Sequence, residues 1–204
     1  MVTLFNQIKI EVFFDEVGRA IAREIDSLPD TTVVSLDIDK STKDFISQHK
    51  INVPSLVKDS ITNPILERQV AGHQLPAGTP FHPGSMYTIE IVNYTIPFNG
   101  DSRFFEYIPR NFGGALVEAN IEARQLTIPL TRFCKIAGNN EIIELIKNEF
   151  IRKVETIELN LNNLSNDVQQ FTPILESNIK AFLNKKINQI KMRNESSDKL
   201  NPFK

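Results

Sequence analysis

The stretch from Phe150 to Phe171, FIRKVETIELNLNNLSNDVQQF, contains the most regular apolar pattern in the chain. Its apolar residues recur at alternating spacings of four and three, which is the heptad pattern of a helix that buries one continuous seam. The seam residues are Phe150, Val154, Ile157, Leu161, Leu164, Val168 and Phe171. This pattern predicts a helix that packs along its length against another helix, from the same chain or from a second copy.

The residues around the seam predict a helical hairpin. Asn139 to Glu141 resemble a helix N-cap followed by an acidic first turn. Thr172-Pro173 can end this helix and start another, because proline is well placed at a first helical position. We therefore expect a coiled-coil-like hairpin over 135–193, with a kinked continuous helix as the alternative. Residues 194–204 have little to bury and are expected to form a flexible tail or linker.

The first 134 residues are expected to form a separate α+β domain. An amphipathic helix is predicted over 8–28, with apolar residues every three or four positions and Pro29 after it. Runs of β-branched and alternating residues predict strands. These runs are 32–38, 51–57, 86–98, 115–123 and 125–133, and 60–72 is expected to be a short helix or an irregular connection. The predicted fold class is thus α+β, a small, mostly antiparallel sheet with an N-terminal helix.

The composition is that of an ordinary globular chain. Of its 204 residues 41% are hydrophobic and 24% charged, and the net charge of −2 gives no general attraction to nucleic acid. No apolar run approaches the ~20 residues that span a bilayer, so we expect no membrane partner. The single cysteine, Cys134, cannot form an internal disulfide, and the N-terminus does not resemble a signal peptide. A cytoplasmic location is therefore expected.

Two histidines mark a possible ligand loop. His73 and His82 flank a stretch rich in proline and glycine, and such loops often carry binding residues. Together with Asp37 and Asp39 they define the alternative interpretation, a small hydrolase or ligand-binding enzyme with its site near residues 73–84. No spacing of histidines or cysteines indicates a metal, and we expect neither a metal nor another cofactor.

A further alternative is nucleic-acid binding. The stretch from Arg103 to Phe112 interleaves aromatic residues with Arg103 and Arg110, a combination that can stack bases and pair with phosphates. The same residues can instead be core aromatics with arginines at the rim. We therefore include both arginines with His73 and His82 as candidate ligand-loop residues.

Three short strings carry a resemblance to a known group of proteins. They are IVNYTIPFNGD at 91–101, NDVQQF at 166–171 and LNPFK at 200–204, in the order strand region, helix and lysine-rich end. This order resembles the N-terminal sensor or oligomerisation region of uncharacterised bacterial multidomain proteins linked to antiphage defence. In those proteins a TIR-type or restriction-endonuclease-like effector domain follows, and we expect no such domain within these 204 residues.

The favoured interpretation is a non-catalytic interaction or sensor module. No catalytic constellation is visible in the sequence, whereas the seam is a regular packing surface. We expect the module to bind a protein partner, or to self-associate through the seam, and so to regulate or assemble an effector in bacterial defence.

Overall fold

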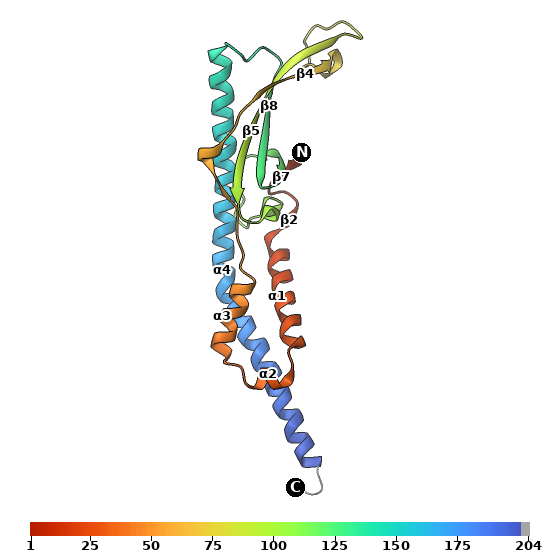
Figure 1. Cartoon of the computed structure of the whole chain (residues 1–204). Helices are drawn as coiled ribbons and strands as arrows, with labels where there is room; N and C mark the ends of the chain where they lie inside the picture. Colours follow the sequence, from red (N-terminus) through yellow and green to blue (C-terminus); the bar gives the residue numbers. More distant parts are fainter. Residues whose placement is uncertain (201–204) are drawn as a thin grey trace. The chain divides into compact units, whose positions relative to one another are not determined.

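The computed structural model describes residues 1–200 and has an α+β fold, as predicted (Figure 1). It contains two compact units, each built from segments that are distant in sequence. Unit 1 contains Met1–Ile8 and Val53–Leu164, and unit 2 contains Lys9–Asn52 and the chain from Ser165 onward. The predicted antiparallel sheet and N-terminal helix are confirmed, and the C-terminal part of the chain contains one long helix.

The sheet of unit 1 is organised around one long strand. This strand, β5 (Met86–Asn99), pairs with β8 on one edge and with β3 and β4 on the other, and all these pairings are antiparallel. β7 continues the sheet beyond β8, and β1 pairs with β7. The bounds are β1 (Val2–Thr3), β3 (Ser55–Leu56), β4 (Ile65–Ala71), β7 (Glu118–Glu122) and β8 (Gln125–Arg132). Two further strands, β2 (Ile8–Lys9) and β6 (Tyr107–Ile108), form a separate pair.

The strand β5 continues through a proline. The strand passes through Pro97 to Asn99. The neighbouring backbone bond to β8 is made by the Phe98 N–H, which donates to the Arg124 carbonyl at 3.0 Å, and the Val57 N–H donates to the Pro97 carbonyl at 2.8 Å. Since neither bond needs an N–H at position 97, proline is tolerated there.

The adjacent runs 115–123 and 125–133, both expected as strands, contain β7 and β8, which pair as an antiparallel hairpin. Its turn places Ala123 and Arg124 in the left-handed region, with φ of 44° and 63°. Two consecutive positive φ values match the right-handed twist of the flanking strands. They also explain why neither turn residue is β-branched.

The core of unit 1 lies between the sheet and the first part of α4 (Asn140–Leu200). Alternate residues of β5, including Tyr94 and Ile96, are buried, as the two-residue period of a strand requires. The Tyr94 ring stacks on Phe150 with a centroid separation of 3.8 Å and an interplanar angle of 13°. This contact fixes the start of the heptad seam on the sheet.

Asn160 joins α4 to the loop that precedes β7. Its side chain is fully buried, donates to the Gly113 carbonyl at 2.7 Å and accepts from the Gly113 N–H at 3.0 Å. A Cβ at Gly113 would lie 2.7 Å from Leu159 Cδ2, and one at Gly114 would lie 2.8 Å from Thr156 Cγ2. The two glycines therefore let the backbone approach the helix closely enough for Asn160 to bind it.

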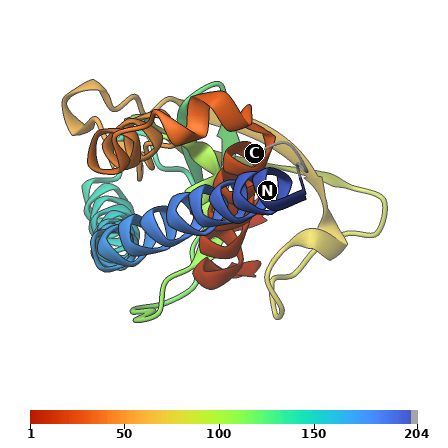
Figure 2. The same cartoon turned by 90° about the horizontal axis from the view of Figure 1, so that it is seen from below.

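Unit 2 is helical and contains α1 (Ile10–Ser27), α2 (Asp30–Val34), α3 (Ile38–Gln48) and the rest of α4. Phe14 of α1 stacks on Phe171 of α4 with centroids 4.1 Å apart. The Lys186 ammonium donates to the carbonyls of Ile25, Asp26 and Leu28 at 2.9, 2.7 and 2.6 Å. A cation thus binds the free carbonyls where α1 (red) ends beside α4 (blue) in Figure 2.

The strand predicted at 32–38 is wrong. Residues 32–34 belong to α2, residues 35–37 connect the two helices, and residue 38 begins α3. Pro29 occupies the N-cap of α2 and Val33 is fully buried, so packing overrides the β-branched composition. The N-cap of α3 is Asp37, which accepts from the Lys40 N–H at 3.1 Å.

The predicted helical hairpin is not confirmed, because α4 runs without a break from Asn140 to Leu200. Pro173 lies inside it and removes one donor of the helical ladder. Phe171 and Leu175 on either side are both buried, and we attribute the continuity of the helix to this packing, which offsets the proline cost of about 3 kcal/mol. Residues 194–200 of the expected tail are helical, and residues 201–204 lie outside the described residues.

Candidate interaction site

The heptad seam is buried inside the chain. Six of its seven residues are no more than 8% exposed, and Val168 is half-buried. Phe150 stacks on a residue of the sheet in unit 1, whereas Phe171 stacks on a residue of α1 in unit 2. The seam is therefore the core-facing side of α4, and a second copy would have to bind another surface.

Four apolar residues of α4 outside the seam have different environments. Ile146 is buried at 1% exposure, whereas Leu145 and Ile151 are exposed. Ile142 is half-buried. These positions do not form one continuous exposed stripe.

Three basic residues late in α4 have partners within unit 2. Lys180 lies 2.9 Å from Asp39 and 3.1 Å from Glu176, and Arg193 lies 3.1 Å from Asp30. The hydrogen bond with Lys180 lowers the pKa of Asp39, and the same bond raises the pKa of Lys180. Lys180, Lys186 and Arg193 thus each have a partner within the fold.

The residues of the alternative enzymatic site belong to different units. His73 lies in the 3-10 turn η2 (Gly72–Gln74) and His82 in the connection to β5, both exposed and in unit 1. Asp37 caps α3 and Asp39 pairs with Lys180, both in unit 2. Within residues 1–200, no cluster of three or more histidine, cysteine or acidic side chains could hold a metal. The two aspartates therefore have structural roles.

The aromatic stretch after residue 102 is part of the core. Phe104, Phe105 and Tyr107 are buried, so their rings are not available to stack on bases. Arg103, in the 3-10 turn η3 (Ser102–Phe105), binds Asp101 with Nη2 and Oδ2 at 2.6 Å, and this hydrogen bonding lowers the pKa of Asp101. Arg110 is exposed. Whether these arginines share a ligand with the two histidines stays a prediction.

The hydrogen-bonding pattern of β4 follows from the residues that precede it. Thr62 and Thr95 exchange two backbone bonds, of 3.1 and 2.8 Å, and the Asn93 N–H donates to the Pro64 carbonyl at 3.2 Å. The same register continues into β4, where Leu66 faces Ile91. Hydrogen-bonded and non-hydrogen-bonded pairs alternate in an antiparallel ladder, so the even-numbered residues of β4 bond to β5.

The odd-numbered residues of β4 consequently direct their backbone groups away from β5. β4 pairs with no strand other than β5 in the described part of the chain. The Ala71 N–H is not available to a further strand, because it donates to Gln74 Oε1 at 3.0 Å. The outward N–H and carbonyl groups of Ile65, Glu67 and Gln69 thus form an unpaired edge.

The edge is exposed on both faces of the strand. Residues 65–69 are all exposed, including Ile65 at 45% and Leu66 at 46%. Residues Met86–Ile89 of β5 pair with β4 but not with β8, so the two strands extend beyond β8 as an arm (Figure 1). Gln69 Nε2 donates to Thr88 Oγ1 at 2.7 Å and ties the two strands of the arm together. The sequence did not predict this strand, because Glu67, Arg68 and Gln69 give no alternation of apolar and polar residues.

A buried carboxylate supports the base of this arm. Glu90 of β5 is 8% exposed and lies on the face of the strand that includes Val92 and Tyr94. Its Oε2 accepts from the N–H groups of Ile136 and Ala137 at 2.5 and 3.1 Å. The Glu90 side chain thus holds the loop before α4 against β5, the strand with which β4 pairs.

Comparison with known proteins gives no match to a protein family, a curated protein or a solved structure. Across residues 1–200, no helix combines the length and the apolar content needed to cross a membrane.

Proposed function

We propose that the chain is a non-catalytic protein-interaction module that binds an extended segment of a partner protein along β4. The single observation that carries this proposal is the unpaired backbone of Ile65, Glu67 and Gln69 on an exposed edge strand. An added strand would satisfy these groups by main-chain hydrogen bonds, a recurring mode of peptide recognition. The proposal includes the role expected from the resemblance, in which the module regulates or assembles an effector in bacterial defence.

Charge disfavours a second copy of the chain as the occupant of this edge. The antiparallel register with full overlap of two β4 strands would place Arg68 opposite Arg68 of the second copy. A register in which Ile65, Glu67 and Gln69 all bond to the second copy would place Glu67 opposite Glu67 of that copy. Like charges directly opposite in a strand pair are destabilising. A different protein is therefore the better partner.

The partner segment has a definable chemistry. It needs about five residues in extended conformation without proline, because it must supply backbone donors and acceptors along the edge. An acidic side chain opposite Arg68, or a basic one opposite Glu67, would complement the charges of β4. Apolar side chains near Ile65 and Leu66 would cover their exposed surface.

A selection from random peptides tests this proposal and does not require the natural partner. Peptides are selected for binding to the full chain, and binders are then measured against Glu67→Pro and Glu67→Ala. Both substitutions remove the carboxylate, but only proline removes the outward N–H, while the bonds to β5 are kept. We expect binders that tolerate alanine and lose at least about tenfold in affinity with proline. Binders that respond equally to the two variants would contradict strand addition at β4.

A further inference from the structure

Unit 2 contains a surface cavity that the proposed function does not use. It is open to solvent, has a volume of about 200 Å³ and is formed by one continuous part of the chain from the end of α1 to the end of α3. Its lining residues are Glu24, Leu28, Thr32, Leu36, Ser41, Asp44, Phe45 and Gln48. The space is large enough for a small organic molecule.

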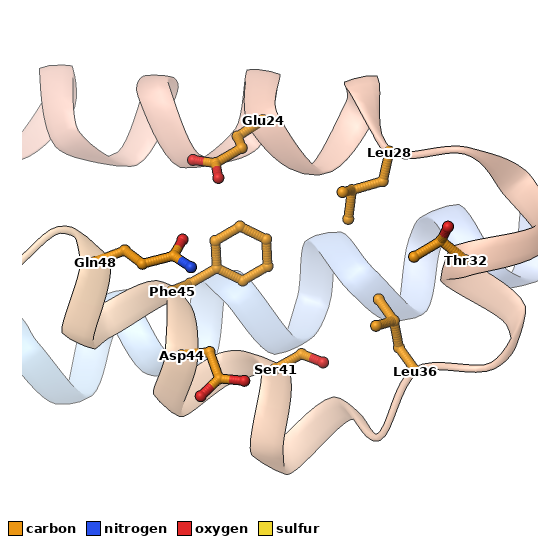
Figure 3. Close-up of a pocket in the computed structure, with 8 residues that line it drawn as sticks. All are labelled: Glu24, Leu28, Thr32, Leu36, Ser41, Asp44, Phe45 and Gln48. Atoms are coloured by element: carbon orange, nitrogen blue, oxygen red, sulfur yellow. The ribbon is translucent and has the colours of Figure 1, made fainter.

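The cavity has an apolar floor and a polar rim. Phe45 is 8% exposed, and Figure 3 shows Leu28, Leu36 and the Thr32 methyl group directed toward one another at one end. At the other end, the Glu24 carboxylate and the Gln48 amide lie beside the Phe45 ring. The Asp44 carboxylate lies at the lower rim and points away from the centre.

The charged groups of the cavity lining are both acidic. The lining residues include two carboxylates, Glu24 and Asp44, and no lysine or arginine. Glu24 is held in place by His49, whose Nε2 lies 2.9 Å from Glu24 Oε2. The second oxygen, Oε1, has no hydrogen bond to another residue of the described chain. An anion would therefore be repelled, whereas a cation can bind beside the ring.

We propose that this cavity binds a small organic cation with an apolar body, such as an alkylguanidinium or an alkylammonium. The charged head would lie between Glu24 and the face of Phe45, and the alkyl chain would cover Leu28 and Leu36. The carboxylate provides a charge-assisted hydrogen bond, and the aromatic ring adds a cation–π contact. The site lies wholly within unit 2 and does not depend on the proposed function of β4.

The test is an NMR titration of the full chain, labelled with nitrogen-15, with butylguanidinium as the probe. Butylurea, which has a similar shape and no charge, is the control ligand. We expect millimolar binding of butylguanidinium, with shifted amides at Ser41, Phe45 and Gln48, and at least about fivefold weaker binding of butylurea.

Three variants make the outcome decisive. Glu24→Gln should weaken butylguanidinium binding at least about fivefold, whereas Glu16→Gln, the same change at an exposed position of α1, should leave it unchanged. Thr32→Lys, at an exposed rim position, should also weaken it by placing a cation in the cavity. Equal binding of butylurea and butylguanidinium, wild-type affinity in Glu24→Gln and Thr32→Lys, or shifts confined to other residues would each overturn the proposal.

Discussion

Replacing Leu161 by alanine tests whether the heptad seam is internal core. Leu161 is 4% exposed, and the substitution removes three carbons from a packed site in unit 1. At about 0.8 kcal/mol for each buried carbon the transfer cost is about 2.4 kcal/mol, and the cavity left behind adds to it. We expect a loss of about 3 kcal/mol in the free energy of unfolding. For a chain of this size, that loss corresponds to a decrease in Tm of about 6–12 °C.

The assay compares Leu161→Ala with Leu145→Ala by thermal and urea unfolding. Leu145 is the same residue type on the same helix in unit 1 but is 52% exposed, so its truncation should cost less than about 1 kcal/mol. Both variants and the wild type should give a Tm that is constant over about a hundredfold range of protein concentration.

The opposite pattern would refute the assignment of the seam to the core. If the seam joined two copies of the chain, the wild-type Tm would rise with protein concentration, and Leu161→Ala would remove this dependence. Equal destabilisation by Leu161→Ala and Leu145→Ala would also refute it, because the two expected costs differ only through burial.

Three further predictions concern polar contacts. Asn160→Ala should reduce the free energy of unfolding by about 2–3 kcal/mol, because it removes both hydrogen bonds to Gly113, whereas Asn162→Ala at an exposed position should be near neutral in urea unfolding. Lys186→Met should cost about 1–3 kcal/mol by removing the cation from the end of α1, and Lys185→Met should cost much less; similar losses in thermal unfolding would contradict this role. The pKa of Asp101 is lowered in the folded state, so its contribution is present above its unfolded pKa near 3.8 and is lost as the pH falls through its lower folded value. Asp101→Asn should therefore flatten the stability profile below about pH 4, and an unchanged acid limb would count against the pairing with Arg103.

The elements that the sequence predicted well have strong periodicity. The helix α1, the strand β5 and the β7–β8 hairpin each bury one face, so their apolar spacing follows the period of the element. By contrast, β4 has exposed residues on both faces, and α2 is a five-residue helix rich in threonine and valine. Neither element has a periodic apolar pattern. The structure of β4 depends on its backbone bonds to β5, and that of α2 depends on packing.

The seam shows what a heptad pattern can and cannot establish. Spacing from Phe150 to Phe171 correctly predicted a helix with one buried face. It did not identify what covers that face, because sheet residues such as Tyr94 and helix residues such as Phe14 bury an apolar seam equally well. The candidate site was missed for the complementary reason, since an unpaired strand edge is a property of the backbone and has no side-chain signature.

Amide hydrogen exchange along β4 tests the central claim, an open strand edge that accepts a partner, most directly. In the free chain, the amides of Leu66, Arg68 and Val70 should be protected by β5, whereas those of Ile65, Glu67 and Gln69 should exchange rapidly. Addition of a selected peptide should protect the second set and leave the first set unchanged. Protection of Ile65, Glu67 and Gln69 in the free chain, or no gain of protection there on peptide binding, would contradict the account.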